Sequence, residues 1–204
     1  KMASTEYVKI SRVKEIEREI KHDVMSLVKA LAEVCGSSGA FVHLGATSSD
    51  ILDTATSLQL RDAVGIIRSR LDDLELVLLR AAGRYKNTIM MGRTHGQHAL
   101  PTTFGFKLSV WMREIARHIQ RLDECKKRLL AGKMSGAVGT QAGLGPDAVK
   151  IQELVMERLG IEAAEISTQI VPAELMTDFS HFVVSSFGVL ANYARDMRNL
   201  QRTE

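Results

Sequence analysis

Residues 60–81 read LRDAVGIIRSRLDDLELVLLRA, and a set of apolar side chains recurs in this stretch at alternating intervals of four and three. The positions are Leu60, Val64, Ile67, Leu71, Leu74, Leu78 and Ala81. This spacing places the apolar side chains on one stripe of a helix, where they can pack against another long helix. The stretch therefore predicts a long helix that belongs to a helical bundle.

Three further segments, at about 10–34, 104–129 and 173–200, show the same three-to-four spacing, and a shorter helix is expected at about 147–159. The segment at 104–129 follows Pro101, which suits the first turn of a helix. The chain has three prolines and no alternating strand pattern. Helices of roughly 30 residues reach about 45 Å, a length that favours a bundle shared between subunits. The sequence thus predicts an all-α, long-helix bundle.

The composition narrows the classes of function. The net charge is +3 over 204 residues, and basic residues are mixed with acidic ones, so nucleic-acid binding is not expected. There is no signal peptide and no apolar run of roughly 20 residues, so we expect a cytoplasmic protein without a membrane anchor. Cys35 and Cys125 have neither metal-site nor redox spacing and are expected to be buried free thiols.

Residues 92–98, Gly-Arg-Thr-His-Gly-Gln-His, are the first candidate for chemistry. His95 and His98 lie in a glycine-containing turn that leads into a long helix. A histidine held there by small residues suits proton transfer, because the ordinary pKa of the imidazole is near neutrality. The alternative is a pair of polar loop histidines without a task.

A second candidate is the start of the helix near residue 47. Thr47 and Asp50 have the spacing of a capping box, which explains them structurally. The hydroxyls of Thr47 and Ser48 and the free amides of a helix N-terminus can equally bind a phosphate or carboxylate. His43, four residues before Thr47, is expected to lie close to that end.

Two other segments have two readings each. Lys21, His22 and Asp23 are predicted within the first helix, on a solvated face or on the rim of a cleft that binds an anion. The glycine-rich run 132–145 is a connector, or a close approach of the backbone to a ligand or a neighbouring subunit. It does not match a nucleotide P-loop, because Met134 follows Gly132-Lys133. Ser167-Thr168-Gln169 offers a further helix cap.

Taken in order, these segments resemble the adenylosuccinate lyases of the fumarase/aspartase superfamily. The matching stretches are Lys-His-Asp at 21–23, Val-His-Leu-Gly-Ala-Thr-Ser-Ser-Asp at 42–50, Gly-Arg-Thr-His-Gly-Gln-His-Ala-Leu-Pro-Thr-Thr-Phe-Gly at 92–105, Gly-Lys-Met-Ser-Gly-Ala-Val-Gly-Thr at 132–140, Ile-Ser-Thr-Gln at 166–169 and Leu-Gln-Arg-Thr-Glu at 200–204. The resemblance covers nearly the whole chain. It implies that residues 1–46 are the last part of an N-terminal helical domain, that 47–204 begin the central bundle, and that the chain is incomplete at both ends.

The resemblance also implies a reaction and its residues. The family eliminates fumarate from adenylosuccinate, giving AMP, and from a succinylated aminoimidazole carboxamide ribotide of purine biosynthesis. His95 matches the general acid, with His98 beside it. Matching substrate-binding positions are Lys21, His22, Asp23, His43, Thr47, Ser48, Thr94 and Gln169. The family uses no metal or other cofactor, and it forms homotetramers whose sites are shared between subunits.

Three departures from the family pattern stand out. Lys21 replaces an arginine, which keeps the charge and loses the bidentate geometry. Ala173-Glu174 stands where the family has Arg-Asp. The family's general base is a serine on a Ser-Ser-x-Met-Pro-x-Lys-x-Asn loop, which no part of this sequence matches, so the 204 residues alone are expected to be inactive.

Two alternative functions remain open from the sequence. One is another lyase of the superfamily, such as an argininosuccinate lyase, acting on a different succinyl adduct. The other is a catalytically silent helical module that serves oligomerisation. The second predicts that replacing His95 has no effect and that neither AMP nor fumarate stabilises the protein.

Overall fold

The structure is a computed structural model that describes residues 4–202, apart from the side chain of Lys127. It divides into two compact units. Unit 1 comprises the residues up to 58 together with 131–172, and unit 2 comprises 59–130 and the residues from 173 onward. The helix α3 (Ser48–Arg84) begins in unit 1 and ends in unit 2. The predicted domain boundary after residue 46 stays a prediction.

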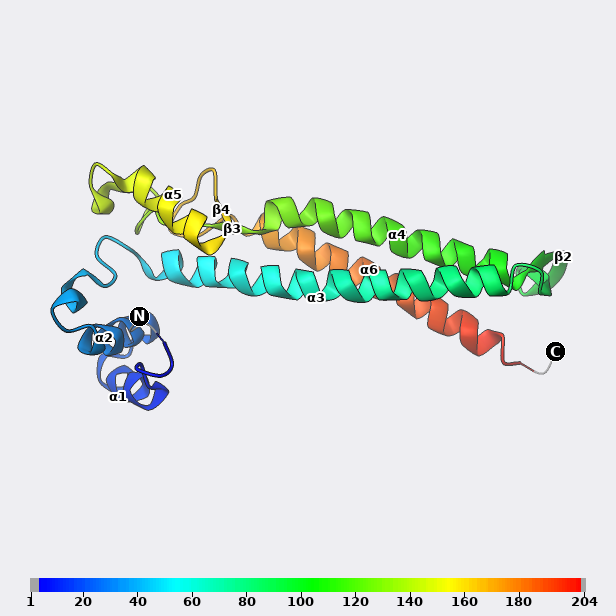
Figure 1. Ribbon diagram of the computed structural model, residues 1–204, viewed down its shortest axis with the longest axis horizontal. Helices are drawn as coiled ribbons and strands as arrows, with labels where there is room; N and C mark the ends of the chain where they lie inside the picture. Colours follow the sequence, from blue (N-terminus) through cyan, green and yellow to red (C-terminus); the bar gives the residue numbers. More distant parts are fainter. Residues whose placement is uncertain (1–3, 203–204) are drawn as a thin grey trace. The chain divides into compact units, whose positions relative to one another are not determined.

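Unit 2 is built on three long helices: the later part of α3, α4 (Phe104–Leu129) and α6 (Glu174–Asn199). Figure 1 shows them running alongside one another. Val64, Leu71 and Leu78 of the quoted stripe are buried in their shared core, and Leu60, Ile67, Leu74 and Ala81 pack against it partly buried. The helix α4 contributes a matching row: Leu108, Trp111, Ile115, Ile119, Leu122, Cys125 and Leu129. The predicted all-α bundle of long helices is therefore confirmed.

A β-hairpin precedes α4 and corrects the sequence-based expectation for this region. Strands β1 (Ile89–Thr94) and β2 (Gln97–Thr103) pair antiparallel, and Pro101 lies opposite Met91 within the ladder instead of in the first turn of a helix. Pro101 is tolerated because a two-stranded ladder leaves each strand an unpaired edge. The helix begins three residues later, where the side chain of Thr103 accepts a hydrogen bond from the backbone N–H of Phe106.

Unit 1 contains two helices where one was predicted. The expected helix at 10–34 is wrong in one respect: it is divided into α1 (Ile10–Ile20) and α2 (Asp23–Val34). Lys21 ends α1 in a left-handed conformation with φ 55°, and His22 is extended. The apolar spacing continues through the break, which is why periodicity alone did not reveal it.

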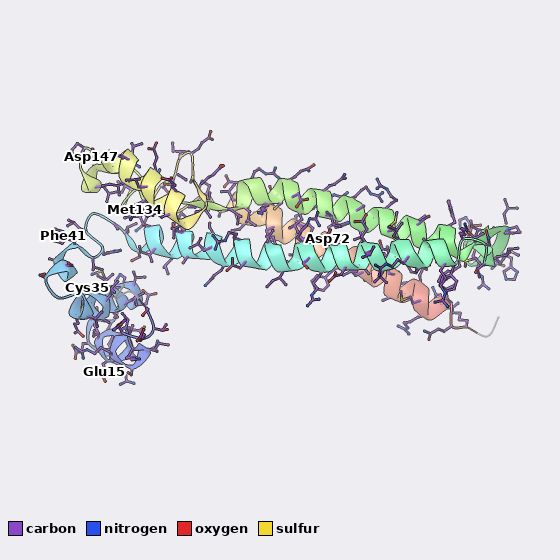
Figure 2. The ribbon with its side chains drawn as sticks, viewed as in Figure 1. Glu15, Cys35, Phe41, Asp72, Met134 and Asp147 are labelled. Atoms are coloured by element: carbon purple, nitrogen blue, oxygen red, sulfur yellow. The ribbon has the colours of Figure 1, made fainter. Side chains whose placement is uncertain are left out.

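The rest of unit 1 is a set of short elements. They are η1 (Gly36–Phe41), β3 (Ala131–Gly132), η2 (Ala142–Leu144), α5 (Ala148–Leu159) and β4 (Glu162–Ala163). Of these, η1 packs against α2. Strands β3 and β4 form a two-residue parallel pair. In Figure 2, Phe41 marks the segment that leads from η1 to α3, and Met134 marks the glycine-rich loop after β3. Within residues 4–202, no helix is both long and apolar enough to cross a membrane.

Candidate active site

Lys21, His22 and Asp23 lie exposed at the junction of α1 and α2: Lys21 and His22 stand between the helices, and Asp23 is the first residue of α2, whereas the sequence suggested one continuous helix. Nδ1 of His22 accepts the backbone N–H of Met25 at 3.3 Å and so caps α2. Oδ1 of Asp23 accepts the N–H of Val24 at 2.7 Å. The junction therefore presents an ammonium group, an imidazole, the carboxylate of Asp23 and a helix N-terminus together. Of these, the ammonium group and the helix N-terminus favour anionic groups.

The second group of predicted residues surrounds the start of α3. Asp50 accepts the backbone N–H of Thr47 at 2.8 Å, so the predicted capping role of Asp50 is confirmed. Thr47 and Ser48 are half-buried, which leaves their hydroxyls near the surface at the helix N-terminus. His43 lies in the preceding turn with φ 69°, and its Nδ1 is buried without a hydrogen-bond partner in the described part of the chain. That nitrogen is available to a ligand or to water.

Behind the α3 N-terminus lies a buried ion pair that the sequence did not reveal. Nζ of Lys133 donates to Oδ1 of Asp50 at 2.5 Å, and the two side chains are 1% and 0% exposed. Burial alone raises the pKa of the Asp50 carboxyl. Hydrogen bonds from Lys133, Ser135 and Thr47, together with the lysine charge, outweigh that effect and hold the pKa below its usual value. Lys133 was visible only as part of a glycine-rich run, and no spacing rule connects residues 50 and 133.

The Gln169 segment is attached to the same region of unit 1. The hydroxyls of Ser135 and Ser167 are 2.9 Å apart, and the N–H of Val171 donates to Oδ2 of Asp53 at 2.7 Å. Gly139 has φ 81°, and a Cβ there would collide with the carbonyl oxygen of Ser167. The segment is thus fixed on both sides of Gln169, whose side chain is exposed. It lies well before α6 and does not cap it.

Thr94 and His95 belong to unit 2, in the hairpin before α4. Thr94 pairs with Gln97, so His95 and Gly96 form a two-residue turn with φ 54° and 74°. Two successive positive φ values are typical of the primed turns that close hairpins. The turn leaves both Thr94 and His95 exposed. The imidazole of His95 is therefore accessible to a substrate, as a general acid must be.

His98, the other histidine of the segment, is on β2. Its Nε2 is 3.3 Å from a guanidinium nitrogen of Arg93 on the opposite strand. A guanidinium can only donate, so this nitrogen of His98 is the acceptor and the imidazole is engaged within the hairpin. The geometry separates the two histidines: His95 is at the tip of the turn, and His98 stabilises the ladder.

The long-helix fold with these loops defines a class of enzyme known from solved structures. The crystal structure of fumarate lyase from Mesorhizobium sp. BNC1 matches with a TM-score of 0.89 and 34% identity, covering 96% of this chain and 46% of that one. The 3-carboxy-cis,cis-muconate lactonizing enzyme from Pseudomonas putida matches with a TM-score of 0.86 and 33% identity, covering 98% and 46%. The chain belongs to the Lyase family, whose model matches residues 2–204.

Among curated relatives, the chain is similar to enzymes named adenylosuccinate lyase. It is 49% identical to that of Pyrococcus abyssi over 202 residues, covering 99% of this chain and 45% of the relative. It is 50% identical to that of Archaeoglobus fulgidus over 193 residues, covering 95% and 43%. The chain thus spans less than half the length of these relatives.

Proposed function

We propose that the chain is part of an adenylosuccinate lyase and carries its general acid and several of its substrate-binding loops. The complete protein would cleave adenylosuccinate to AMP and fumarate, and would release fumarate from the succinylated aminoimidazole carboxamide ribotide. The observation that carries the proposal is the 49% identity to the adenylosuccinate lyase of P. abyssi over 99% of this chain.

The proposed reaction is an elimination with two proton transfers. A base removes a proton from the carbon beside a succinyl carboxylate, the neighbouring C–N bond breaks, and the departing nitrogen takes up a proton from an acid. We assign the acid to His95, because its imidazole is exposed at the tip of the hairpin turn. The base is expected to be a serine from a loop that these 204 residues do not contain.

The substrate carries a phosphate and two carboxylates, so the proposed site needs several anion-binding positions. Unit 1 supplies Lys21, His22 and Asp23 at the α2 N-terminus, His43, Thr47 and Ser48 at the α3 N-terminus, and Gln169 on its fixed loop. Thr94 accompanies His95 in unit 2. Helix N-termini stabilise negative charge through unpaired backbone N–H groups and the helix dipole. No metal or cofactor is needed for this scheme.

The proposed assembly is a homotetramer with sites shared between subunits. Unit 2 exposes large apolar side chains on α3 and α6: Ile66, Val77, Leu79, Val184, Phe187 and Met197. Val184 and Phe187 are 72% and 69% exposed. Apolar faces of this extent are usually covered by another chain, and further copies of the same long helices are suitable partners.

We place the enzyme in the cytoplasm, in purine nucleotide synthesis. Cys35 and Cys125 are both free thiols, which fits a reducing compartment.

A substrate panel on the complete encoded polypeptide tests the proposed activity. Adenylosuccinate, the succinylated ribotide and argininosuccinate are offered separately, and fumarate release is followed by its ultraviolet absorbance. The proposal expects turnover of the first two substrates. Turnover of argininosuccinate alone would assign the chain to another branch of the family, and no turnover of any of them would contradict the proposal.

The isolated chain of 204 residues provides a second test. It lacks the serine loop, so the purified chain is expected to release no fumarate from adenylosuccinate. Turnover by this chain would show that the general base lies within it and would contradict the proposed division of roles.

A further inference from the structure

The carboxylate of Asp50 is saturated with hydrogen bonds. Its Oδ1 accepts Nζ of Lys133 at 2.5 Å and the N–H of Ser135 at 2.9 Å. Its Oδ2 accepts the N–H of Thr47 at 2.8 Å and the N–H of Gly136 at 3.1 Å. One buried carboxylate thus holds the N-terminus of α3 and three groups of the loop after β3, the ammonium of Lys133 and the N–H groups of Ser135 and Gly136.

The same face of α3 continues the attachment of this loop. The hydroxyl of Thr54, one turn after Asp50, donates to the carbonyl of Lys133 at 3.1 Å and accepts its N–H at 3.0 Å. The hydroxyl of Ser57 donates to the carbonyl of Ala131 at 2.5 Å. Asp50, Thr54, Ser57 and Lys133 are all buried. This polar face of α3 therefore holds the segment over two helical turns. Only the first of its contacts, between Asp50 and Lys133, involves charged groups.

The contacts of the Asp50–Lys133 ion pair connect directly to residues of the proposed site. Thr47, whose N–H Asp50 accepts, is followed by Ser48. On the loop side, Ser135 donates its N–H to Asp50 while its hydroxyl lies 2.9 Å from that of Ser167, two residues before Gln169. The uncharged contact between Ser57 and Ala131, in contrast, involves no residue of the proposed site and no neighbour of one.

The effect of this ion pair is clearest from what the loss of one partner would do. A buried ion pair is weak evidence for stability, because desolvating both charges offsets their attraction. Removing one partner, in contrast, leaves an uncompensated charge in a site that excludes water. Without Lys133 the carboxylate would draw in water or a proton, and either change disturbs the amides that it accepts.

We propose that Lys133 is a positioning residue for substrate binding. Through Asp50 it fixes the hydroxyl-bearing start of α3, and through the loop 133–136 and Ser135 it fixes the segment that carries Gln169. This inference rests on the proposed function, because Thr47, Ser48 and Gln169 are its substrate-binding residues. Lys133 itself is 1% exposed, so the proposed role is to position other residues and not to bind the substrate directly.

The test compares Lys133→Met with Ser57→Ala in the complete encoded polypeptide. Methionine keeps much of the lysine stem and removes the charge. Ser57→Ala removes one buried hydrogen bond, to the carbonyl of Ala131 in β3 just before the loop, without touching Asp50. Lys133→Met is expected to raise KM for adenylosuccinate at least about tenfold with kcat changed less than about threefold, since binding contacts are lost. Ser57→Ala is expected to leave both constants within about twofold of wild type.

Amide hydrogen exchange gives a readout that does not depend on turnover. In Lys133→Met the N–H groups of Thr47, Ser135 and Gly136 are expected to exchange at least about tenfold faster, while in Ser57→Ala they keep their wild-type rates. If Lys133→Met yields no folded protein, Ser135→Ala is used, which cuts the contact to Ser167 and leaves the ion pair intact. It is expected to raise KM about threefold or more with kcat unchanged.

The outcomes separate the two proposals. Equal KM values for Lys133→Met and Ser57→Ala, a loss confined to kcat, or unchanged exchange at the three amides would each overturn the positioning role. For Ser135→Ala, an unchanged KM would overturn it. Absence of adenylosuccinate turnover by the wild-type protein would contradict the proposed function instead, and the exchange rates would still test whether Lys133 fixes these loops.

Discussion

At the scale of single residues, His95 combines a left-handed backbone with an exposed side chain. It is one of four non-glycine residues with positive φ among residues 4–202, and its side chain is exposed at a hairpin tip. A left-handed conformation is uncommon for residues with a side chain, and asparagine, aspartate and histidine are the types enriched in it. The backbone of the turn thus fixes the position of the His95 Cα and Cβ atoms, while the exposed tip of the hairpin leaves room for a substrate beside the imidazole.

Replacing His95 by asparagine removes the acid and keeps a residue that accepts positive φ. In the complete polypeptide, kcat for adenylosuccinate is expected to fall by a factor on the order of 10² to 10⁴, the usual contribution of general acid catalysis. His98→Asn is the matched control, because His98 contacts Arg93 within the ladder. It is expected to lower kcat less than about tenfold. Equal losses in the two variants, measured by fumarate release, would contradict the assignment of the acid.

Asp50 gives a prediction about pH. Its pKa is lower in the folded protein than in the unfolded chain, so the stability that it contributes is present above the unfolded value of about 4 and is lost as the pH falls through the folded value. The urea midpoint of wild type should therefore exceed that of Asp50→Asn at pH 7, and the difference should shrink below about pH 4. A difference that stays constant from pH 7 to 3 would show that the charge of Asp50 does not stabilise the fold.

At the scale of elements, the long helices could be predicted from the sequence, whereas the break between α1 and α2 and the hairpin before α4 could not. The stripe from Leu60 to Ala81 is read directly from spacing, because burial on one side of a helix imposes that period. The hairpin at 89–103 lacks a comparable signal. No residue of its strands is buried, so no buried face imposes an alternating pattern. Its turn residues are His-Gly instead of Asn-Gly or Asp-Gly.

In the candidate site, too, the sequence predicted local motifs and not the contacts between distant residues. Thr47 and Asp50 were identified because a cap is a local motif of four residues, and the contact between them is present. The break at Lys21 depends on His22 acting as a cap, an uncommon choice that propensity does not favour. The partnership of Asp50 with Lys133 joins positions 83 residues apart, and only the fold brings them together.

The start of α4 gives a prediction at this scale. Thr103→Ala removes the side-chain acceptor for the N–H of Phe106 and is expected to destabilise the protein by about 1 kcal/mol. Thr56→Ala, on an exposed face within α3, is the control and is expected to be neutral or slightly stabilising, since alanine is the better helix former. Urea unfolding of both variants measures this. Equal effects would show that the cap of Thr103 does not stabilise the start of α4.

At the scale of the whole molecule, the exposed apolar side chains of α6 predict assembly. Replacing Val184 and Phe187 together by aspartate would place two charges in the proposed contact between subunits. The double variant is expected to elute at a lower mass than the wild-type protein, for which we propose a tetramer, in size exclusion with light scattering. Asn192→Asp, at an exposed polar position of α6, should keep the wild-type mass. A double variant that remains tetrameric would exclude this face from the interface.

The central claim is that the protein containing this chain releases fumarate from adenylosuccinate with His95 as the acid. The most direct measurement is the simultaneous appearance of AMP and fumarate from adenylosuccinate, in the complete wild-type polypeptide and in His95→Asn. We predict equimolar amounts of both products from wild type and a rate lower by at least about 100-fold in the variant. No product from wild type, or an undiminished rate in His95→Asn, would contradict the claim.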